Sequence, residues 1–476
     1  MQRDSVFSPT TLGCGRHLPN RLVKVALYEH LADFHGGPPN KHHLALYEAW
    51  SKGTQGYGMV LTGNVQVSRE HLTLGRDMVI PSHISDVTIE PFKRLSNVIH
   101  SNGTSLAIMQ LSHTGRQSSN IITGTLSRPL APSAIRLGNE ISGSLAKLFY
   151  WLLFRTPKAM VPGDIDHVVD RFVLGAQVAL QSGFDGIQLH AAHGYLLAQF
   201  LNPKTNRRTD EFAAQEGNEL NLLRVLVSRI RAVVPATFVI GIKLNAGDYS
   251  ASVDDPSISP KEQRALNHIT TIAGWGGVDF IEISGGDYES PDFMSTRPKS
   301  SRQAFFSHVS QKAVQTLESM PRKVDSPPLP LILLTGGLRT PAALHSALKS
   351  NHAHLLGIGR SAILCPDIPS RLASSSSTDT TPFAPEPVIA PPPGLPAIPL
   401  VGAGATMSWY GMQMRYIAEW VGGTPKPGVA YPDYSLTGPS AVLWTWIWLS
   451  EPYTYTGLFR LLLWPCLAAA AILYAF

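Results

Sequence analysis

Three side chains capable of acid–base chemistry lie close together near the middle of the chain, at His190, His193 and Tyr195. They follow a short apolar run at residues 187–189. Parallel α/β proteins place their catalytic groups in this way, at the carboxyl ends of buried strands. Two imidazoles can hold a carbonyl or anionic oxygen, and a neighbouring phenol can supply a proton. The pattern therefore predicts an active site at the end of a strand.

Two other interpretations of this cluster are weaker. A strand-to-helix junction with polar caps explains a lone histidine, but it explains three such groups together less well. A metal site would need a carboxylate or a thiolate to complete the coordination set. The three cysteines, Cys14, Cys365 and Cys466, are far apart and show neither metal-ligand spacing nor a disulfide framework. We therefore expect no metal and a reducing compartment.

The elements that must position this cluster alternate regularly up to about residue 368. Short β-branched runs predict strands at 22–26, 59–61, 106–110, 186–189, 238–244, 278–283, 331–334 and 355–358. Between them, amphipathic runs predict helices at 42–54, 89–101, 164–181, 219–233, 260–273, 302–317 and 341–348. This alternation predicts an α/β protein with a (β/α)8 TIM barrel. A doubly wound sheet is the main rival, but residues 25–29 lack the Gly-rich turn that normally follows its first strand.

The other strand ends carry groups that suit a large anionic cofactor. Gln110 ends the third strand, and a primary amide donates and accepts hydrogen bonds at once. Lys243 lies in an otherwise apolar fifth strand, where an unpaired ammonium would be costly, so we expect it to face an anion. The seventh and eighth strands end in Gly-rich turns at Gly337 and Gly359, and Arg360 follows the second turn. Such turns bind phosphate in many barrels, and the whole outline fits FMN.

Composition limits the other partners. The 476 residues carry a formal net charge of only +5, with no basic run, so nucleic acid is not an expected ligand. The N-terminus has no apolar stretch, so a cleaved signal peptide is not supported and a cytoplasmic location is expected. Homo-oligomer formation is left open.

An apolar segment at residues 145–154 interrupts the barrel pattern at a place where a loop is expected. It is too short to span a bilayer. We expect a helix that packs as a lid over the barrel mouth, with a membrane-touching surface as the alternative.

The composition divides the chain into a barrel at residues 1–373, a Ser/Pro-rich linker at 374–399 and a C-terminal extension at 400–476. The extension has an expected amphipathic helix at 407–421, three tryptophans within 441–449 and no charge within 461–476. About twenty apolar residues are needed to span a bilayer, so we expect membrane contact through 441–476. A single-pass tail anchor, a monotopic hairpin and a helix docked on a partner subunit are the alternatives.

Residues from about 7 to 372 resemble the old yellow enzymes, the FMN-dependent NADH:flavin oxidoreductases and ene-reductases. The resemblance rests on residues 19–21 (Pro-Asn-Arg), 110–116 (Gln-Leu-Ser-His-Thr-Gly-Arg), 190–195 (His-Ala-Ala-His-Gly-Tyr) and 208–211 (Arg-Thr-Asp-Glu), together with Gly337 and Gly359-Arg360. The resemblance is most specific in the block that begins at His190. The apolar C-terminal extension indicates a fungal type of this family.

The resemblance implies that His190 and His193 bind the electron-withdrawing oxygen of a substrate and that Tyr195 protonates the carbon next to that group. It implies that the flavin contacts are Ala26 and Tyr28 near O4, Asn64, Gln110 at the pyrimidine end, Lys243 at N1/O2, and Gly337, Gly359 and Arg360 at the phosphate. Two of these depart from the family. Lys243 stands where arginine is usual, which removes the bidentate geometry, and Tyr28 stands where threonine or cysteine is usual.

The implied reaction is a ping-pong reduction of an activated C=C bond by NAD(P)H and FMN, on a lipophilic enone-type substrate. A role in tailoring a secondary metabolite would suit such a substrate. Two alternatives stay open: the same flavin barrel acting oxidatively as a desaturase or aromatising enzyme, and a non-catalytic, membrane-tethered scaffold.

Overall fold

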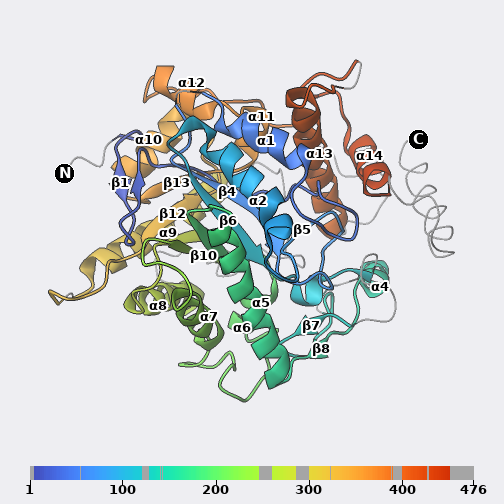
Figure 1. The fold of residues 1–476 in the computed structure, drawn as a ribbon, viewed down its shortest axis with the longest axis vertical. Coiled ribbons are helices and arrows are strands. Elements are labelled where there is room, and N and C mark those ends of the chain that lie inside the picture. Colours follow the sequence, from blue (N-terminus) through green and yellow to red (C-terminus); the bar gives the residue numbers. More distant parts are fainter. Residues whose placement is uncertain are drawn as a thin grey trace.

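The computed structural model describes residues 5–450, except for 54, 121–127, 140, 142, 246–259, 286–299, 322, 388, 390–398 and 426–427. Eight parallel strands form a closed barrel at its centre (Figure 1): β3 (Leu22–Lys24), β4 (Met59–Gln66), β6 (Leu106–Ser112), β9 (Gly186–Ala191), β10 (Val239–Asn245), β11 (Phe280–Ser284), β12 (Leu331–Thr335) and β13 (Leu355–Ile358). The barrel closes because β3 pairs with both β13 and β4. This confirms the predicted (β/α)8 fold and excludes the doubly wound sheet.

The interior of the barrel changes character along its axis. Side chains alternate along each strand, so every second residue points inward. In the lower part these positions form one apolar cluster that includes Val23, Ile108, Val239, Phe280 and Leu333, all at most 1% exposed. Toward the carboxyl ends the inward positions become polar. The polar layer consists of Gln110, Gln188, Lys243, Glu282 and Thr335.

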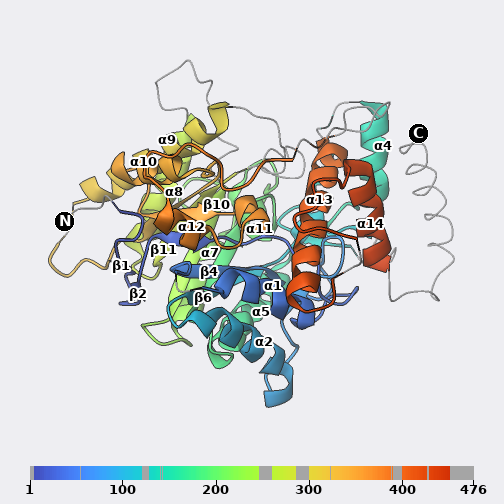
Figure 2. The same ribbon diagram turned by 90° about the horizontal axis from the view of Figure 1, so that it is seen from above.

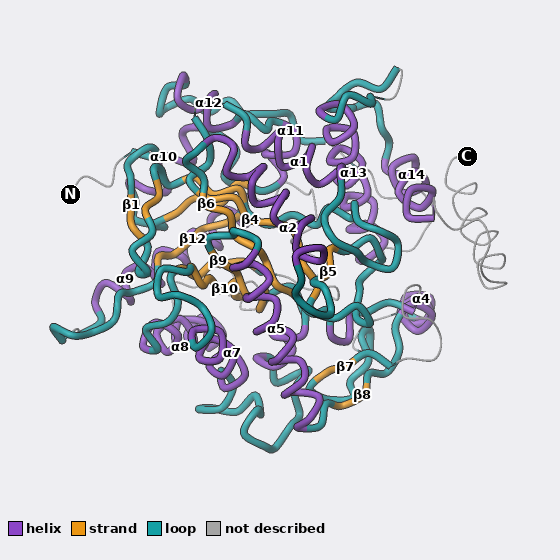
Figure 3. Tube along the Cα trace, viewed as in Figure 1, coloured by secondary structure: helices purple, strands orange, loops and turns teal. Residues whose placement is uncertain are grey.

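Helices cover the outside of the barrel, as the tube drawing shows (Figure 3). The seven predicted helices are present, each within a few residues of its expected bounds: α1 (Lys41–Ser51), α2 (Asp86–Ile99), α5 (Pro162–Gln181), α7 (Asn221–Arg231), α8 (Pro260–Gly274), α9 (Ser300–Ser319) and α10 (Pro341–Lys349). The short helices α11 (Arg360–Leu364) and α12 (Ile368–Ser374) follow the last strand. Side-chain caps fix where three of the helices begin. Asn40, Ser85 and Thr340 accept hydrogen bonds from backbone N–H groups in the first turns of α1, α2 and α10.

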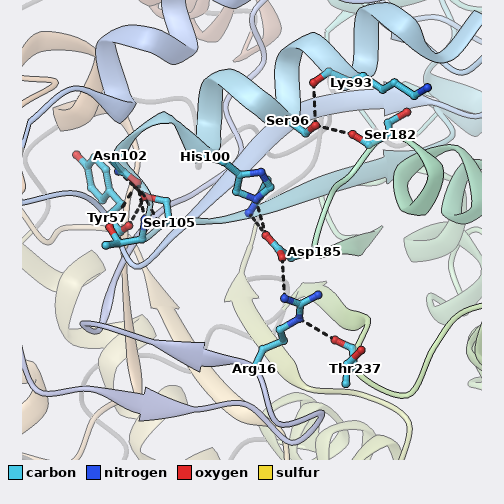
Figure 4. A network of polar contacts seen from close by, with 12 residues as sticks. Arg16, Tyr57, Lys93, Ser96, His100, Asn102, Ser105, Ser182, Asp185 and Thr237 are labelled. Atoms are coloured by element: carbon cyan, nitrogen blue, oxygen red, sulfur yellow. Dashed lines mark hydrogen bonds and ion pairs between the residues drawn. The ribbon is translucent and has the colours of Figure 1, made fainter.

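The amino ends of the strands carry a structural network around Asp185 (Figure 4). The Oδ2 atom of Asp185 lies 2.8 Å from His100 Nε2, and its Oδ1 atom lies 3.2 Å from a guanidinium nitrogen of Arg16. Arg16 follows the first strand of a hairpin, β1 (Thr10–Thr11) and β2 (His17–Leu18), and it also donates to the carbonyl of Thr237. These contacts fasten the hairpin beneath the barrel, at the end opposite His190.

The segment at 145–154 forms the predicted helix, α4 (Ser144–Leu153), next to a small sheet of β7 (Leu130–Ala131) and β8 (Lys158–Ala159). Its inner face, with Ala146 and Tyr150, packs into a buried cluster that also contains Tyr195. Its outer face exposes Trp151, which is 57% accessible, together with Leu148 and Leu152. The helix therefore packs in one cluster with Tyr195 and presents an apolar surface to the outside.

Two helices beyond the barrel, α13 (Pro399–Val421) and α14 (Gly438–Ser450), pack against each other, and α13 also packs on α1. Figures 1 and 2 show the pair side by side on one flank of the barrel. The ring of Trp448 on α14 contacts two guanidinium groups: its centroid lies 3.7 Å from Cζ of Arg415 and 4.1 Å from Cζ of Arg76. Its Nε1 donates to the carbonyl of His30 at 3.0 Å. Trp448 therefore binds the extension to the loop after β3.

Among the described helices, none is both long and apolar enough to cross a bilayer. The uncharged stretch predicted at 461–476 lies outside the described residues. Part of the predicted linker lies against the barrel: Asp379 O accepts from Ala342 N at 2.8 Å, and Phe383 N donates to the carbonyl of Arg339 at 3.0 Å.

Candidate active site

His190 is the residue before the last in β9, on the inward side of the barrel, and is 3% exposed. Its Nδ1 accepts a hydrogen bond from Ala192 N at 3.3 Å. A neutral imidazole that accepts at Nδ1 carries its proton on Nε2. His190 is therefore set to donate a hydrogen bond from Nε2.

His193 lies in the turn that leaves β9 and has a left-handed backbone, with φ of +57°. This conformation is uncommon for a residue with a side chain. Two contacts maintain it: Gln117 Nε2 donates to the carbonyl of His193 at 2.9 Å, and His193 Nε2 lies 2.8 Å from Ser284 Oγ at the end of β11. The turn brings the His193 ring back toward His190, with ring centroids 5.0 Å apart.

Both imidazoles are neutral at physiological pH. Removal from water lowers the pKa of His190 and that of His193 well below the usual value, and the positive charge of Lys243 lowers both further. Neutral imidazoles bind an oxygen as hydrogen-bond donors without transferring a proton to it. The pair therefore has the character of an oxyanion-type holder.

Tyr195 directly precedes α6 (Leu196–Leu201) and is 3% exposed. Its ring stands edge-on to that of His190, with centroids 4.8 Å apart. On its other side it packs in the cluster with Leu137, Tyr150 and Phe154. The predicted triad of His190, His193 and Tyr195 is thus brought together by one strand end and one turn.

A continuous polar chain crosses the barrel directly below these rings. Gln110 Nε2 donates to Gln188 Oε1 at 2.6 Å, and Gln188 Nε2 donates to Glu282 Oε2 at 2.8 Å. The other carboxylate oxygen of Glu282, Oε1, lies 3.0 Å from Lys243 Nζ and accepts from Thr335 Oγ1 at 3.0 Å. The anion expected to face Lys243 thus includes a carboxylate of the protein itself.

Sequence reasoning missed two members of this chain, Gln188 and Glu282. Their positions carried a signal. Each is a polar residue inside a mostly apolar strand, and each stands two residues before a polar residue near the carboxyl end of that strand, His190 or Ser284. A buried carboxylate in such a strand must find a cation or several donors. Glu282, at 0% exposed, has both.

The remaining predicted flavin contacts on the first two strands line the same end of the barrel. Asn64 follows a bulge in β4 and is aligned with Gln110 on β6. Ala26 lies just beyond β3, and Tyr28 packs against the cluster that holds Tyr195. The hydroxyl of Tyr28 lies 2.5 Å from Thr73 Oγ1, so this departure from the family pattern has its own polar partner.

Behind this loop lies a buried group that the sequence analysis did not identify. Glu29 accepts from Tyr47 OH and, at 2.8 Å, from Gly63 N. Lys24 donates to the carbonyl of Leu61 at 3.1 Å and lies over the ring of Trp50 at 3.8 Å. Burial lowers the pKa of Lys24 to about 7 and raises the pKa of Glu29. The group fixes the backbone of β4 just before Asn64.

The predicted phosphate end lies at the ends of β12 and β13. Gly336 and Gly337 have left-handed φ values of +113° and +72°, which glycine adopts without strain. A Cβ added at Gly359 would lie 3.6 Å from Val25 Cγ2 and 3.9 Å from Leu27 Cδ2, which are ordinary van der Waals distances. Arg360 follows as the first residue of α11, and its guanidinium lies 5.5 Å from the ring centroid of Tyr410 on α13.

The described residues thus place four kinds of group at the mouth of the barrel. These are the two imidazole donors, the phenol of Tyr195, the polar layer with Gln110 and Lys243, and the glycines and Arg360 at the ends of β12 and β13. Among those residues, no group of three or more His, Cys, Asp or Glu side chains is placed to hold a metal ion. This combination defines a cofactor-dependent barrel oxidoreductase.

The comparisons with known proteins identify the family. Residues 5–379 match the NADH:flavin oxidoreductase / NADH oxidase family. The chain belongs to that family, which binds FMN and uses NADH or NADPH as reductant.

Curated relatives agree with this assignment. The chain is 37% identical over 389 residues to the NADH-dependent flavin oxidoreductase iliE of Neonectria sp., covering 79% of this chain and 48% of the relative. It is 35% identical over 387 residues to the protein of the same name from Hypocrea jecorina, covering 79% of this chain and 92% of the relative. The chain thus spans about half the length of the first of these relatives.

A solved structure supports the fold. The old yellow enzyme homologue from Zymomonas mobilis superposes with a TM-score of 0.58 at 23% identity, covering 78% of this chain and 92% of the other. The resemblance to old yellow enzymes inferred from the sequence is confirmed.

The residues present fit FMN. Gln110 offers an amide edge and Lys243 offers a cation. At the other end, Gly337 and Gly359 offer backbone N–H groups without a side chain, and Arg360 offers a guanidinium. These are the donor types that a flavin ring and its phosphate require.

Proposed function

We propose that the chain reduces the C=C bond of an α,β-unsaturated carbonyl compound with FMN and NAD(P)H. The main support is that His190, His193 and Tyr195 lie together at one end of the barrel. The ring centroids of His193 and Tyr195 lie 5.0 Å and 4.8 Å from that of His190. Two neutral donors beside one phenol can hold a carbonyl oxygen and protonate the same molecule. FMN, when bound, supplies the hydride chemistry between NAD(P)H and the substrate.

In this proposal the histidines hold the substrate oxygen. His190 donates from Nε2 because its Nδ1 is already engaged by Ala192 N. Ser284 orients the ring of His193. Hydrogen bonds to the carbonyl oxygen draw electrons from the conjugated system, which makes the β-carbon a better hydride acceptor.

Tyr195 supplies the proton. The hydride adds to the β-carbon, the C=C π bond breaks, and the phenol O–H proton goes to the α-carbon. The two electrons come from NAD(P)H, and solvent restores the proton of Tyr195. The apolar neighbours of Tyr195, including Tyr150 and Phe154, favour a lipophilic substrate and would suit a tailoring step on a secondary metabolite.

We assign the cofactor contacts by position. Gln110 binds the pyrimidine edge, Lys243 the N1/O2 region, and Gly337, Gly359 and Arg360 the phosphate. Ala26, Tyr28 and Asn64 border the ring. These roles are supported by the donor types and by the common position of these residues at the carboxyl ends of the strands.

The test compares Tyr195→Phe with Tyr150→Phe, a matched tyrosine of the same cluster. The purified protein should be yellow, bleach with NADPH and recover its colour with a cyclic enone. Tyr195→Phe should slow the recovery at least 100-fold while bleaching continues, and Tyr150→Phe should keep both steps. Unchanged recovery in Tyr195→Phe would refute the role of the phenol, and a protein that neither is yellow nor takes up FMN would refute the proposal.

The direction of the reaction is tested by product analysis. Under nitrogen with NADPH, an enone should become the saturated ketone. If the enzyme instead converts the saturated ketone to the enone under air and leaves the enone untouched under nitrogen, the oxidative alternative is right.

The division into a barrel at 1–373, a linker at 374–399 and an extension at 400–476 is also a proposal. It is supported by the end of α12 at Ser374 and the start of α13 at Pro399. Membrane contact through 441–476 rests on the composition of the tail. Truncation after Ser450 keeps α13 and α14, and it should move the protein from the membrane pellet to the supernatant. An untruncated protein that is already in the supernatant would refute membrane contact.

A further inference from the structure

We propose that α13, which lies outside the barrel in sequence, completes the active site: Tyr410 holds Arg360 at the phosphate end, and Met407 forms part of the substrate wall beside Tyr195. The inference rests on the proposed function, because it uses the roles given there to Arg360 and Tyr195. It assigns to the extension two specific tasks, cofactor retention and substrate selection.

The first contact is at the phosphate end. The guanidinium of Arg360 lies 5.5 Å from the ring centroid of Tyr410, within the range of a cation–π interaction. Tyr410 is 5% exposed, and burial raises the pKa of its hydroxyl to about 12. An arginine side chain has several rotatable bonds, so an aromatic ring that limits its positions reduces the entropy lost when it binds an anion. Tyr410 is therefore a positioning residue for Arg360.

The second contact is at the substrate end. Met407 packs against the cluster that contains Tyr195, Leu137 and Tyr150. Tyr28, on the loop after β3, packs against the same cluster. A flexible thioether side chain at this place adapts to a lipophilic ligand and limits its size.

Both contacts come from one face of one helix. Residues three apart in an α-helix lie on the same side, about 4.5 Å apart along the axis. Met407 and Tyr410 have this spacing, so the placement of α13 sets both contacts together.

Hydrogen bonds to the segment that follows α13 brace this helix. Trp409 Nε1 donates to the carbonyl of Leu436 at 2.9 Å. Gln413 exchanges two hydrogen bonds with the backbone of Asp433, both at 2.9 Å. Near the phosphate end, Arg339 on the loop after β12 forms an ion pair with Glu386. The segment after α13 thus braces this helix, its packing on α1 and α11 places it against the barrel, and the linker is fastened at the phosphate end.

The phosphate arm of the test uses riboflavin, which is FMN without its phosphate. Holoprotein is stripped of flavin, and the affinities for FMN and riboflavin are measured by flavin fluorescence. Tyr410→Leu should weaken FMN binding about fivefold to tenfold and leave riboflavin binding unchanged. Tyr410→Phe, which keeps the ring, should bind FMN like the wild type. Equal weakening of both flavins, or no change in either, would overturn the role of Tyr410.

Arg360→Gln separates this inference from the assignment on which it rests. If this change leaves the ratio of FMN to riboflavin affinity intact, the assignment of Arg360 to the phosphate is wrong. If it lowers the ratio and Tyr410→Leu does not, only the role of Tyr410 is wrong.

The substrate arm uses Met407→Ala with Trp420→Ala as the control. Trp420 lies on the same helix and is 63% exposed. Met407→Ala should change the ratio of kcat/KM between a bulky and a small enone at least threefold, with FMN affinity unchanged. Trp420→Ala should change neither quantity. A selectivity ratio in Met407→Ala equal to that of the wild type would overturn the role of Met407.

Discussion

Lys243 and Glu282 form a buried ion pair across neighbouring strands, with Nζ and Oε1 3.0 Å apart. Their side chains are 5% and 0% exposed, and their strands place them directly opposite each other. Glu282 also accepts from Gln188 and Thr335, so its charge is compensated on both oxygens. The lysine that stands where the family usually has arginine therefore does not face the cofactor as an isolated cation.

Glu282→Gln should raise the midpoint potential of the bound flavin. The amide keeps the size of the side chain but removes the negative charge beside Lys243, so the positive charge acts more strongly on the reduced flavin. We expect a shift of about 30 mV, which corresponds to about 1.4 kcal/mol for a two-electron couple. Spectroscopic redox titration measures it.

Lys243→Met removes the positive charge instead of the negative one, so it should lower the midpoint potential of the bound flavin. A potential that moves in the same direction in both variants would show that structural disturbance, and not charge, is responsible.

Ser284→Ala should weaken substrate binding by removing the partner of His193 Nε2. Without this 2.8 Å contact the imidazole can rotate, so the loss should appear as a KM increase of about threefold to tenfold, from the typical value of one hydrogen bond. Steady-state kinetics with one enone measures it. Ser284→Thr keeps the hydroxyl and should stay close to wild type; a KM that is unchanged in the alanine variant would contradict the orienting role.

Gly63→Ala should destabilise the fold near the loop after β3. A Cβ at this position would lie 1.8 Å from Oε2 of Glu29 and 2.2 Å from the carbonyl oxygen of Leu27. Neither neighbour can move freely, because Glu29 is held by Tyr47 and by the backbone of residue 63. We expect a loss of about 1–3 kcal/mol, measured by urea unfolding. Gly163→Ala is the control, since no atom lies within 4 Å of its Cβ position.

Stability should fall in mild acid because several histidines are buried in the neutral form. Burial lowers the pKa of His30 to about 4, that of His43 to about 3 and that of His71 to about 4. The unfolded chain binds these protons below about pH 6.5, whereas the folded chain does not, so stability is present above that pH and is lost as the pH falls. Each such histidine lowers the free energy of unfolding by about 1.4 kcal/mol for each pH unit that the pH falls within that range.

Urea unfolding at pH 7.5, 6 and 5 measures this slope. His43→Gln keeps an acceptor near the cap of α1 and should reduce the slope by the contribution of one proton. A slope that is the same in the wild type and in His43→Gln would contradict the neutral burial of His43.

The fold and the proximity of His190, His193 and Tyr195 could be predicted because their signals are local. Strand and helix periodicity repeats eight times, and His190, His193 and Tyr195 lie within six residues. The apolar run at 145–154 also gave a correct helix, since a strongly apolar segment in a loop must bury one face. Gln188 and Glu282 were missed because their meaning depends on a contact across the barrel, which no local pattern contains.

The contribution of α13 could not be read from the sequence for a related reason. Met407 and Tyr410 lie more than two hundred and about fifty residues from their partners Tyr195 and Arg360. A methionine and a tyrosine in an apolar helix are most simply explained as core residues. Only the path of the chain after α12 brings them to the mouth.

The apolar lower half of the barrel limits the route of protons in the proposed reaction. Val23, Ile108, Val239, Phe280 and Leu333 fill the interior beneath the polar layer and are at most 1% exposed. The side chains of this described cluster offer no polar atoms that could guide water from the amino-terminal side. In the proposed reaction, the phenol of Tyr195 is therefore reprotonated from the carboxyl-terminal opening of the barrel, through which the substrate enters.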